Sequence, residues 1–373
     1  MSKKPISTEK PHLKTLLVGV KAPYNKINPI EIYFEEFLNL IKTLGLKYED
    51  KITIKLRSLD KANFFTKGKL QELKKYCDDN EIEEVVLSEI LTPLQERNLE
   101  EILDCTVWDR EKLILEIFRN AAHSAEGKIQ VEMAEIEFLK TRLAGKGVEL
   151  AQQEGIVGSK GPGETSKEVL KRHLAEKYRR AKKRLVSLKK SREIQRKKRL
   201  ESNIPLICLV GYTNAGKSSL LNLLTKSHVE VENKLFATLD TTTRELFIDH
   251  QKIGLISDTV GFISQLPHHL VEAFKSTLDE LQYANLLLHV VDISNPIWED
   301  QIKIVNETLE ELDVHKNILF VFNKTDKLND QELKIAKEKT SKYQPNVFIN
   351  TKSKENLKEL INFLKNYKFS KET

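Results

Sequence analysis

Eight residues in the second half of the chain have the types and spacing of a phosphate-binding loop: residues 211–218 read Gly-Tyr-Thr-Asn-Ala-Gly-Lys-Ser. An apolar run at residues 206–210 precedes the loop and a leucine-rich helical pattern follows it, so the expected order is strand, loop and helix. In such a loop the backbone N–H groups point at phosphate, the lysine reaches the β and γ phosphates, and the serine hydroxyl can ligate Mg²⁺. The expected ligand is therefore a nucleoside triphosphate, and this context disfavours the alternative of an ordinary glycine-rich turn.

Two further motifs follow in the order that a guanine-nucleotide site requires. Asp258-Thr259-Val260-Gly261 follows an apolar stretch, which places a carboxylate where it can hold Mg²⁺ through water and a glycine N–H where it can face a γ-phosphate. Asn323-Lys324-Thr325-Asp326 follows another apolar run, and a carboxylate there can accept hydrogen bonds from the N1–H and 2-amino groups of guanine. Adenine lacks that pair of donors, and a buried carboxylate left unpaired is costly. Each motif alone is compatible with a surface turn, but together with the loop they predict a GTP site.

Two segments near these motifs are less regular. Asn350-Thr351-Lys352 follows a strand-like run and stands where guanine-nucleotide proteins usually carry Ser-Ala-Lys, whose backbone N–H contacts the guanine carbonyl. Residues 235–244 are rich in threonine and suit a switch loop that becomes ordered around Mg²⁺ and the γ-phosphate. Several of these threonines could be the metal ligand, and a lead-in to the strand-like residues 245–248 is the alternative.

The elements that must position these motifs predict an α/β protein with a domain at each end of the chain. Residues 202–367 are expected to form a P-loop G domain with a mainly parallel sheet, which leaves residues 368–373 as a tail. Residues 1–122 alternate between strand-like runs and helical patterns, which predicts a small parallel α/β domain. The strand-like runs there are 15–20, 52–56, 84–87 and 105–108, and the helical patterns are 31–44, 67–76, 93–103 and 111–121.

Between these domains, residues 123–201 are expected to form an antiparallel two-helix arm. Apolar residues recur every three or four positions in both predicted helices, as in a seam between two helices. They are Ile129, Met133, Ile136, Leu139 and Leu143 in the first helix, and Leu174, Tyr178, Ala181, Leu185 and Leu188 in the second. Six glycines between Ala144 and Glu164 predict that a long loop, not helix, connects the two.

The second helix of this arm is strongly basic. From Lys167 to Arg199 the chain has sixteen Lys or Arg residues and three Glu residues, in a protein whose formal net charge is +6. A solvated face is the usual reading of a charged helix, but such faces mix signs and this one does not. We therefore expect a polyanionic partner, and the scarcity of aromatic residues favours contact with a phosphate backbone over base stacking.

Length and composition agree with a protein of two or three domains. At 373 residues and 40% hydrophobic, the chain can bury more than one core. It contains no apolar stretch of about 18 residues and no signal-peptide core at its start, so a cytoplasmic location is expected, with loose peripheral membrane attachment left open. The three cysteines lack the spacing of a zinc site and are expected to be reduced.

The chain resembles the HflX GTPases, relatives of the Obg-type translation-factor class, over most of its length. In the second half the resemblance lies in residues 258–263 with Leu266-Pro267 and in Phe236-Ala237-Thr238-Leu239-Asp240. In the first half it lies mainly in Gly161-Pro162-Gly163-Glu164-Thr165. The resemblance implies that Thr238 is the switch-loop ligand of Mg²⁺, and that the glycine-rich loop reaches toward the peptidyl transferase region of large-subunit ribosomal RNA.

Together the residues and the resemblance predict a ribosome-associated GTPase that binds GTP and Mg²⁺ and is a monomer off the ribosome. It is expected to bind the large ribosomal subunit through the basic arm and to split stalled or inactive ribosomes into subunits. The alternatives are a GTPase that assists large-subunit assembly, and an RNA-binding stress factor that uses GTP only as a sensor. Many regulatory GTPases carry a water-orienting Gln directly after Asp-x-x-Gly, but Phe262 stands there, so hydrolysis is expected to be slow alone and stimulated by the ribosome.

The expected catalytic residues are Lys217 and Thr238, and the expected metal ligands are Ser218 and Thr238. The expected nucleotide-binding residues are Gly211, Tyr212, Thr213, Asn214, Ala215, Gly216, Lys217, Ser218, Phe236, Ala237, Thr238, Leu239, Asp240, Asp258, Thr259, Val260, Gly261, Asn323, Lys324, Thr325, Asp326, Asn350, Thr351 and Lys352.

Overall fold

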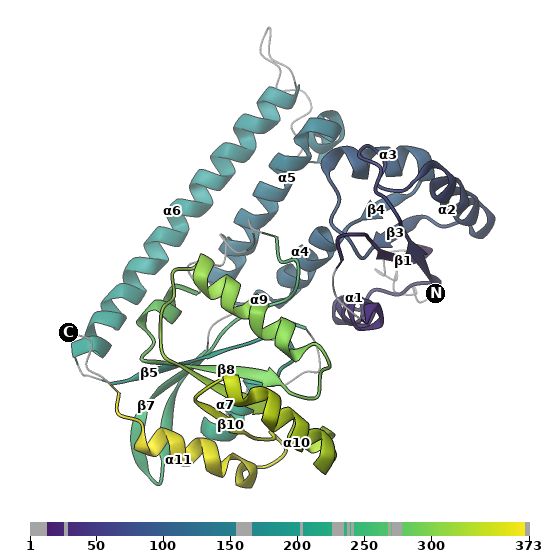
Figure 1. The fold of residues 1–373 in the computed structure, drawn as a ribbon. Helices are drawn as coiled ribbons and strands as arrows, with labels where there is room; N and C mark the ends of the chain where they lie inside the picture. Colours follow the sequence, from purple (N-terminus) through teal and green to yellow (C-terminus); the bar gives the residue numbers. More distant parts are fainter. Residues whose placement is uncertain are drawn as a thin grey trace, which may run out of the picture. The chain divides into compact units, whose positions relative to one another are not determined.

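The structure is a computed structural model, and it divides into two compact units (Figure 1). It describes residues 13–25, 29–153, 166–201, 204–225, 235–236, 239, 242–267, 270 and 278–369, and leaves undescribed the side chains of 144–153, 166 and 189–201. Unit 1 consists of Met1–Glu116 and Thr141–Leu170, and unit 2 of Ile117–Lys140 and Lys171–Thr373. The boundaries between the two units fall inside helices, at residues 116–117, 140–141 and 170–171, and the expected division into three domains stays a prediction.

Unit 1 contains a four-stranded parallel sheet in the order β2-β1-β3-β4. The strands are β1 (Thr15–Lys21), β2 (Asp50–Lys55), β3 (Glu84–Leu87) and β4 (Thr106–Trp108), and they alternate with α1 (Ile30–Leu44), α2 (Lys67–Asn80), α3 (Pro93–Leu103) and α4 (Arg110–Ala121). Strands β1 and β3 are buried along almost their whole length, as expected of central strands in a parallel sheet. The predicted parallel α/β fold of this part is confirmed.

Local signals in the sequence explain where the helices of unit 1 begin and end. Helix α3 begins with a capping box in which the Thr92 hydroxyl accepts from the Gln95 N–H and the Gln95 side chain accepts from the Thr92 N–H, and Pro93 occupies the first turn. Helix α1 ends at Gly45, whose φ of 73° is the left-handed conformation that closes a helix.

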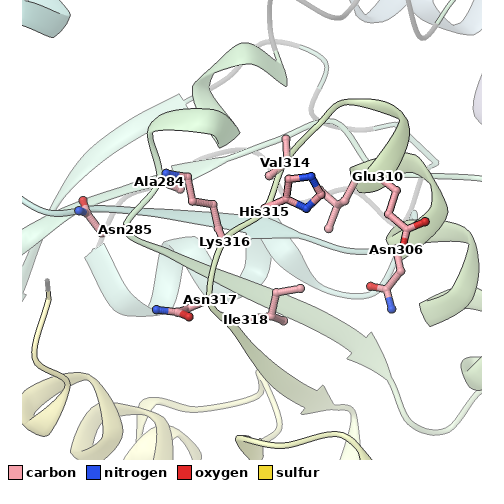
Figure 2. Close-up of a pocket in the computed structure, with 10 residues that line it drawn as sticks. Ala284, Asn285, Asn306, Glu310, Val314, His315, Lys316, Asn317 and Ile318 are labelled. Atoms are coloured by element: carbon pink, nitrogen blue, oxygen red, sulfur yellow. The ribbon is translucent and has the colours of Figure 1, made fainter. Parts of the chain in front are cut away.

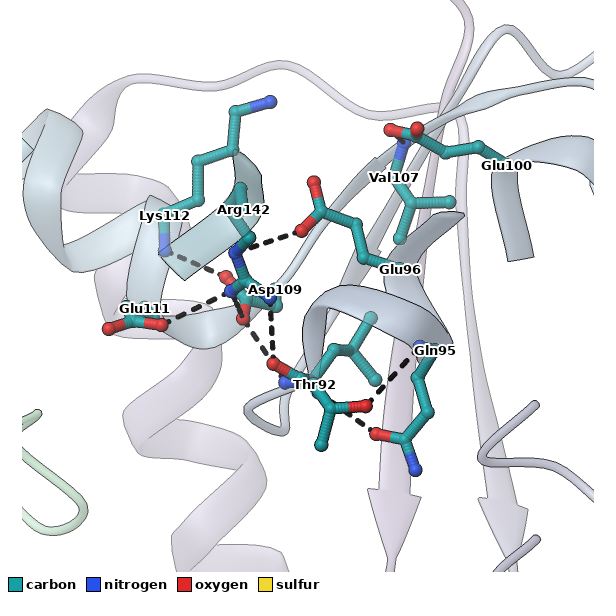
Figure 3. A network of polar contacts seen from close by, with 10 residues as sticks. Thr92, Gln95, Glu96, Glu100, Val107, Asp109, Glu111, Lys112 and Arg142 are labelled. Atoms are coloured by element: carbon teal, nitrogen blue, oxygen red, sulfur yellow. Dashed lines mark hydrogen bonds and ion pairs between the residues drawn. The ribbon is translucent and has the colours of Figure 1, made fainter. Parts of the chain in front are cut away.

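A buried polar network holds the part of helix α5 (Ala125–Gln153) that belongs to unit 1 (Figure 3). Arg142 is 4% exposed, and its guanidinium forms ion pairs with Glu96 at 3.0 Å, Asp109 at 2.8 Å and Glu111 at 3.2 Å. It also donates to the Leu91 carbonyl at 2.9 Å. Burial and the charge of Asp109 raise the pKa of Glu111 to about 7. Because unpaired buried charge is expensive, loss of Arg142, which would leave these carboxylates without their cation, would strongly destabilise unit 1.

In unit 2, helices α5 and α6 (Ser166–Glu201) form an antiparallel pair (Figure 1). Their apolar seam contains Ile129 and Met133 of α5 and Ala181 and Leu185 of α6, with Tyr178 and Leu188 packed against it. Two contacts along the seam fix the direction. Glu132 pairs with Arg184, whereas Lys140, about two turns later in α5, lies 4.4 Å from the ring of Tyr178, which precedes Arg184 in α6. The predicted helix seam is thus present.

The connecting loop begins later than the sequence suggested. Helix α5 continues through Gly145 and Gly147 to Gln153, whereas a loop was expected from Ala144. A helix-interior glycine costs only about 1 kcal/mol relative to alanine, and the following Val-Glu-Leu-Ala-Gln-Gln contains ordinary helix residues that continue the helix. Residues 154–165, which include the Gly161 to Thr165 motif, lie outside the described residues.

The rest of unit 2 contains a six-stranded sheet in the order β10-β9-β8-β5-β7-β6, in which β6 alone among these strands runs antiparallel. Its strands are β5 (Leu206–Val210), β6 (Thr242–Ile248), β7 (Gln251–Asp258), β8 (Leu286–Asp292), β9 (Ile318–Asn323) and β10 (Asn346–Phe348). Its helices are α7 (Lys217–Thr225), α9 (Trp298–Glu311), α10 (Asp330–Lys339) and α11 (Lys358–Asn366), with short 3₁₀ turns η1 (Asp279–Tyr283), η2 (Thr325–Lys327), η3 (Thr340–Lys342) and η4 (Lys354–Leu357). This confirms the predicted P-loop domain with a mainly parallel sheet.

Alternate residues of the central strand β5 face two separate cores. Ile207 and Leu209 pack with leucines of α7 and α11, whereas Leu206, Cys208 and Val210 pack with residues of α9. Helices therefore cover both faces of the sheet, and the carboxyl ends of β5, β7 and β9 carry three of the sequence motifs at one edge. None of the helices in the described residues is long and apolar enough to cross a membrane.

A candidate nucleotide-binding site

The loop between β5 and α7 has a backbone that requires its two glycines. Gly211 has φ 146° and Gly216 has φ 101°, in the region that side chains rarely adopt. A Cβ on Gly211 would lie 2.2 Å from the Val290 carbonyl oxygen, and one on Gly216 would lie 2.3 Å from the Asn323 amide nitrogen. Both glycines are therefore needed for close contact with the neighbouring strands as well as for the turn.

The lysine of this loop is buried, and its side chain is hydrogen-bonded to the loop backbone. Lys217 is 6% exposed, and its ammonium donates to the carbonyls of Gly211 at 3.0 Å and Tyr212 at 2.9 Å. Burial lowers the pKa of Lys217 to about 8, although the nearby Asp258 carboxylate acts in the opposite direction. Helix α7 begins at Lys217. The positive end of the helix dipole and the charged lysine therefore both favour an anion at this loop.

Ser218 and Asp258 form a pair of oxygen donors suited to Mg²⁺. The Ser218 hydroxyl donates to Asp258 at 2.7 Å, and Asp258 is fully buried at the end of β7. A hydroxyl that donates its proton keeps its lone pairs for a metal, and hard oxygen ligands are those that Mg²⁺ prefers. Because Mg²⁺ usually completes its shell with water and substrate phosphates, a hydroxyl with a neighbouring carboxylate fits the ion.

The segment after Asp258 is bonded to the phosphate loop as a short parallel bridge. The Thr213 N–H donates to the Phe262 carbonyl at 2.7 Å, and the Phe262 N–H donates to the Gly211 carbonyl at 3.2 Å. A Cβ on Gly261 would lie 2.8 Å from the Thr213 side chain and 3.0 Å from the Lys217 ammonium. Gly261 is thus placed beside the lysine, as the Asp-x-x-Gly motif predicts. Thr259 is fully buried and donates to the Leu209 carbonyl at 2.7 Å, and Val260 is buried too.

The Phe262 side chain is part of the protein core. It is 3% exposed and packs with Leu278, Leu281 and Val305. The sequence indicates only that the Phe262 side chain lacks polar atoms. The structure shows that this side chain also packs in the core. An exchange to alanine would therefore remove core contacts, which typically costs about 3–5 kcal/mol.

Residues 323–326, the predicted base-recognition motif, are hydrogen-bonded directly to the loop at residues 211–218. The Asn323 side-chain amide donates to the Ala215 carbonyl at 2.9 Å, and the Lys324 ammonium donates to the Asn214 carbonyl at 2.8 Å. Lys324 also forms an ion pair with Asp292 at 2.6 Å. The sequence motifs did not include Asp292. Its position, a carboxylate at the end of an apolar strand, could have identified it as a candidate.

Residues 350–352, the last of the predicted nucleotide segments, lie against residues 323–326. Lys352 forms an ion pair with Asp326 at 2.9 Å, which lowers the pKa of that carboxyl group. A carboxylate has about four lone-pair sites, so Asp326 can keep this partner and still accept two donors from a guanine ring. The Thr325 hydroxyl donates to the Ile349 carbonyl at 2.9 Å, and Asn350 accepts from the Lys352 N–H and the Asn356 amide. The hydroxyl of Thr351 would lie 3.8 Å from a Cβ on Gly216.

The structure describes two of the site residues that were predicted in the switch loop. Phe236 and Leu239 are buried, and the Phe236 ring lies edge-on against Phe118. Ala237, Thr238 and Asp240 lie outside the described residues. The structure thus brings together Gly211 to Ser218, Asp258 to Gly261, Asn323 to Asp326 and Asn350 to Lys352, while the role of Thr238 stays a prediction.

A separate pocket of about 660 Å³ lies at the opposite edge of the same sheet (Figure 2). It is lined by residues that precede β8 and β9, including Asn285, His315 and Lys316, and by Asn306 and Glu310 of α9. Because none of the nucleotide motifs lines it, this pocket is not part of the candidate site.

Comparisons with known proteins agree with this geometry. Three family models match the chain: a GTP-binding GTPase N-terminal model at residues 31–119, a GTP-binding GTPase middle-region model at 121–199, and a 50S ribosome-binding GTPase model at 206–324. A GTPase HflX of Caldanaerobacter subterraneus subsp. tengcongensis is 44% identical over 299 residues, which cover 79% of this chain and 70% of that protein. A GTPase HflX of Escherichia coli is 40% identical over 309 residues, covering 83% and 72%.

Among solved structures, the crystal structure of the SsGBP–GDP complex is similar, with a TM-score of 0.50 and 26% sequence identity. The similarity covers 94% of this chain and 97% of the other. That structure is described as a complex with GDP.

Proposed function

The chain belongs to the HflX family of GTPases and accordingly binds and hydrolyses GTP, and we propose that it does so to separate ribosomes into subunits. The observation that carries the ribosomal part of this proposal is the exposed basic surface of helix α6. Arg179, Arg180, Lys182 and Lys183 are all exposed, while Ala181 and Leu185 of the same helix face the seam. A surface of one charge on a rigid helix pair suits the phosphate backbone of RNA.

Two arginines of α6 form ion pairs with acidic residues near the solvent. Arg180 pairs with Glu176 at 2.5 Å and Arg184 pairs with Glu132 at 3.0 Å, and both arginines are more than half exposed. Such exposed pairs contribute little to stability and can exchange for phosphate contacts. The large ribosomal subunit is the proposed partner, because the matching model for residues 206–324 is described as a 50S ribosome-binding GTPase.

At the nucleotide site, the proposed binding residues follow from the contacts already described. Lys217 and the N–H groups at the start of α7 hold the β and γ phosphates, and the Asp326 carboxylate accepts from the guanine ring. The Ser218 hydroxyl and, in the switch loop, Thr238 are the proposed Mg²⁺ ligands. Bound Mg²⁺ supplies positive charge to the phosphate oxygens during transfer.

The proposed cycle links this site to the ribosome. The γ-phosphate orders the Thr238 loop and the Asp258 to Gly261 segment, which favours the form that binds the large subunit. The helix pair then occupies the subunit interface, and hydrolysis releases the protein. Water positioning is assigned to the ribosome, since the Phe262 ring is packed in the core and carries no polar atom.

Binding of purified large subunits at several salt concentrations tests the role of α6. Affinity should fall by roughly 0.7–0.9 log units per log unit of salt for each phosphate neutralised. Replacing Arg179, Arg180, Lys182 and Lys183 by Glu should weaken binding and flatten that slope. The matched control replaces Lys327, Lys334, Lys337 and Lys339, near or in α10, by Glu, which changes the net charge equally. An unchanged slope in the α6 variant would show that this surface is merely solvated.

A further inference from the structure

Asp292 is the last residue of strand β8 and belongs to none of the nucleotide motifs. One of its carboxylate oxygens pairs with the Lys324 ammonium at 2.6 Å. The other oxygen accepts from the Ser294 N–H at 3.1 Å and from the Ser294 hydroxyl at 2.5 Å. The side chains of Asp292 and Lys324 are 15% and 18% exposed. The carboxylate is therefore held at both oxygens, and solvent screens the ion pair less than it would an exposed one.

The same lysine reaches the phosphate loop. The Lys324 ammonium also donates to the Asn214 carbonyl at 2.8 Å. Both residues have a left-handed backbone, with φ of 60° at Asn214 and 64° at Lys324. Residues with a Cβ adopt this region uncommonly, and it persists where surrounding contacts hold it. The ion pair with Asp292 and the hydrogen bond to Asn214 are contacts of this kind, so together they join the end of β8, the start of the base motif and the loop.

The hydrogen bond to Asn214 determines which way a peptide of the loop faces. The C=O and N–H groups of a trans peptide point in opposite directions, so a carbonyl that faces Lys324 turns the Ala215 N–H the other way. That N–H donates to the Tyr212 carbonyl at 3.3 Å, and the Lys217 ammonium donates to the same carbonyl at 2.9 Å. The Ala215 N–H thus lies beside the charge that is proposed to meet the phosphates. Backbone N–H groups placed in this way suit an anion.

We propose that Asp292 is a positioning residue of the nucleotide site, which holds Lys324 against the Asn214 carbonyl and so keeps the loop shaped for the phosphates that GDP and GTP share. The inference rests on the proposed nucleotide-binding role of residues 211–218 and Lys324, and adds to it a residue outside the motifs. A loop that is already shaped loses less conformational freedom when the ligand binds, which favours affinity.

Titration of the full-length protein with GDP and with a non-hydrolysable GTP analogue, in the presence of Mg²⁺, tests this role. Asp292→Asn keeps the shape of the side chain and removes its charge. It should weaken binding of both nucleotides about equally, by roughly 2- to 30-fold, the range for networked residues that do not touch the ligand. Ser294→Ala removes one hydrogen bond to the carboxylate and leaves the ion pair, so it should cause a smaller loss for both nucleotides.

Glu299→Gln is the matched control. It also exchanges a carboxylate for an amide near the end of β8, and it breaks an exposed ion pair with Lys342 that does not reach the loop. Both nucleotide affinities should stay unchanged in this variant.

A double variant tests whether Asp292 acts through Lys324. Lys324→Met should weaken binding by itself, and adding Asp292→Asn should weaken it little further, because the ion pair is already lost. A role of Asp292 in general stability would instead give additive losses. Additive losses, a loss confined to the GTP analogue, or unchanged affinities in Asp292→Asn would each overturn the proposal.

Lys324→Met alone distinguishes this inference from the binding role on which it rests. Weaker binding in Lys324→Met with unchanged binding in Asp292→Asn would overturn the positioning role and leave the proposed role of Lys324 standing. Unchanged binding in Lys324→Met would remove Lys324 from the site, and the inference with it. The titrations contain no ribosomes, so their outcome is independent of the proposed ribosomal partner.

Discussion

The Asn323 side chain donates a hydrogen bond to the Ala215 carbonyl, and so joins the end of β9 to the phosphate loop. The same amide nitrogen is the atom that a Cβ on Gly216 would meet at 2.3 Å. Asn323 is fully buried at the sheet edge where the nucleotide motifs meet. Asn323 thus helps to hold the backbone of the loop at residues 211–218.

We predict that Asn323→Ala weakens GDP and GTP-analogue binding about equally, by roughly 5- to 150-fold. The range corresponds to about 1–3 kcal/mol for a buried carbonyl left without its donor. Asn317→Ala is the matched control, since Asn317 stands just before the other end of β9 and bonds the exposed Tyr367 hydroxyl. Isothermal titration of both variants provides the comparison. Identical affinities in the two variants would mean that the Asn323 bond does not shape the loop.

Base selection should depend on Asp326. Asp326→Asn is expected to weaken GTP binding and to improve binding of xanthosine triphosphate, whose 2-oxo group replaces the guanine 2-amino donor. The change swaps an acceptor for an amide that can donate. Asp330→Asn, an exposed acidic residue in the first turn of α10, serves as the control and should leave both affinities unchanged. If GTP binds equally to wild type and Asp326→Asn, Asp326 does not contact the base.

Nucleotide affinity should fall at alkaline pH because of Lys217. Burial lowers the pKa of its ammonium to about 8, so the free protein loses this charge above that pH. A bound triphosphate favours the charged form, and binding above pH 8 therefore requires proton uptake. Affinity should be nearly constant from pH 6.5 to 7.5 and then decline, approaching tenfold per pH unit. A flat profile between pH 7 and 9 would show that Lys217 stays protonated in the free protein.

Hydrolysis by the protein alone should be slow, because the Phe262 side chain cannot orient water and is packed in the core. The large ribosomal subunit should stimulate it by one to several orders of magnitude, as partner-supplied groups do in related switches. Phe262→Leu, which keeps an apolar core residue, should retain much of the stimulated rate. Single-turnover assays with and without ribosomes measure both. Fast hydrolysis without ribosomes would reveal a catalytic group that neither sequence nor structure has identified.

Most of the fold could be predicted because its signals are local. The strand-like runs at 84–87 and 206–210 are recovered as β3 and β5 at the same residues. The loop glycines likewise follow from spacing alone. These features depend on neighbours in the chain, which a sequence displays directly.

Long-range contacts could not be predicted in the same way. The ion pairs of Arg142 with Asp109 and Glu111 join α5 to residues more than thirty positions earlier in the chain. The ion pair between Lys324 and Asp292 and the ring contact between Phe118 and Phe236 join residues that are far apart in sequence. The pairing itself depends on the folded arrangement, although the place of Asp292 after an apolar run was a signal for that one residue.

Sucrose-gradient sedimentation of intact 70S ribosomes with the protein tests the central proposal most directly. With a non-hydrolysable GTP analogue, the 70S peak should convert into separate large and small subunits, whereas GDP should leave it intact. The α6 variant with four Lys or Arg residues replaced by Glu should lose this activity while its affinity for the analogue stays unchanged. A 70S peak that persists with the analogue, while the protein co-sediments with ribosomes, would contradict ribosome splitting as the function of this GTPase.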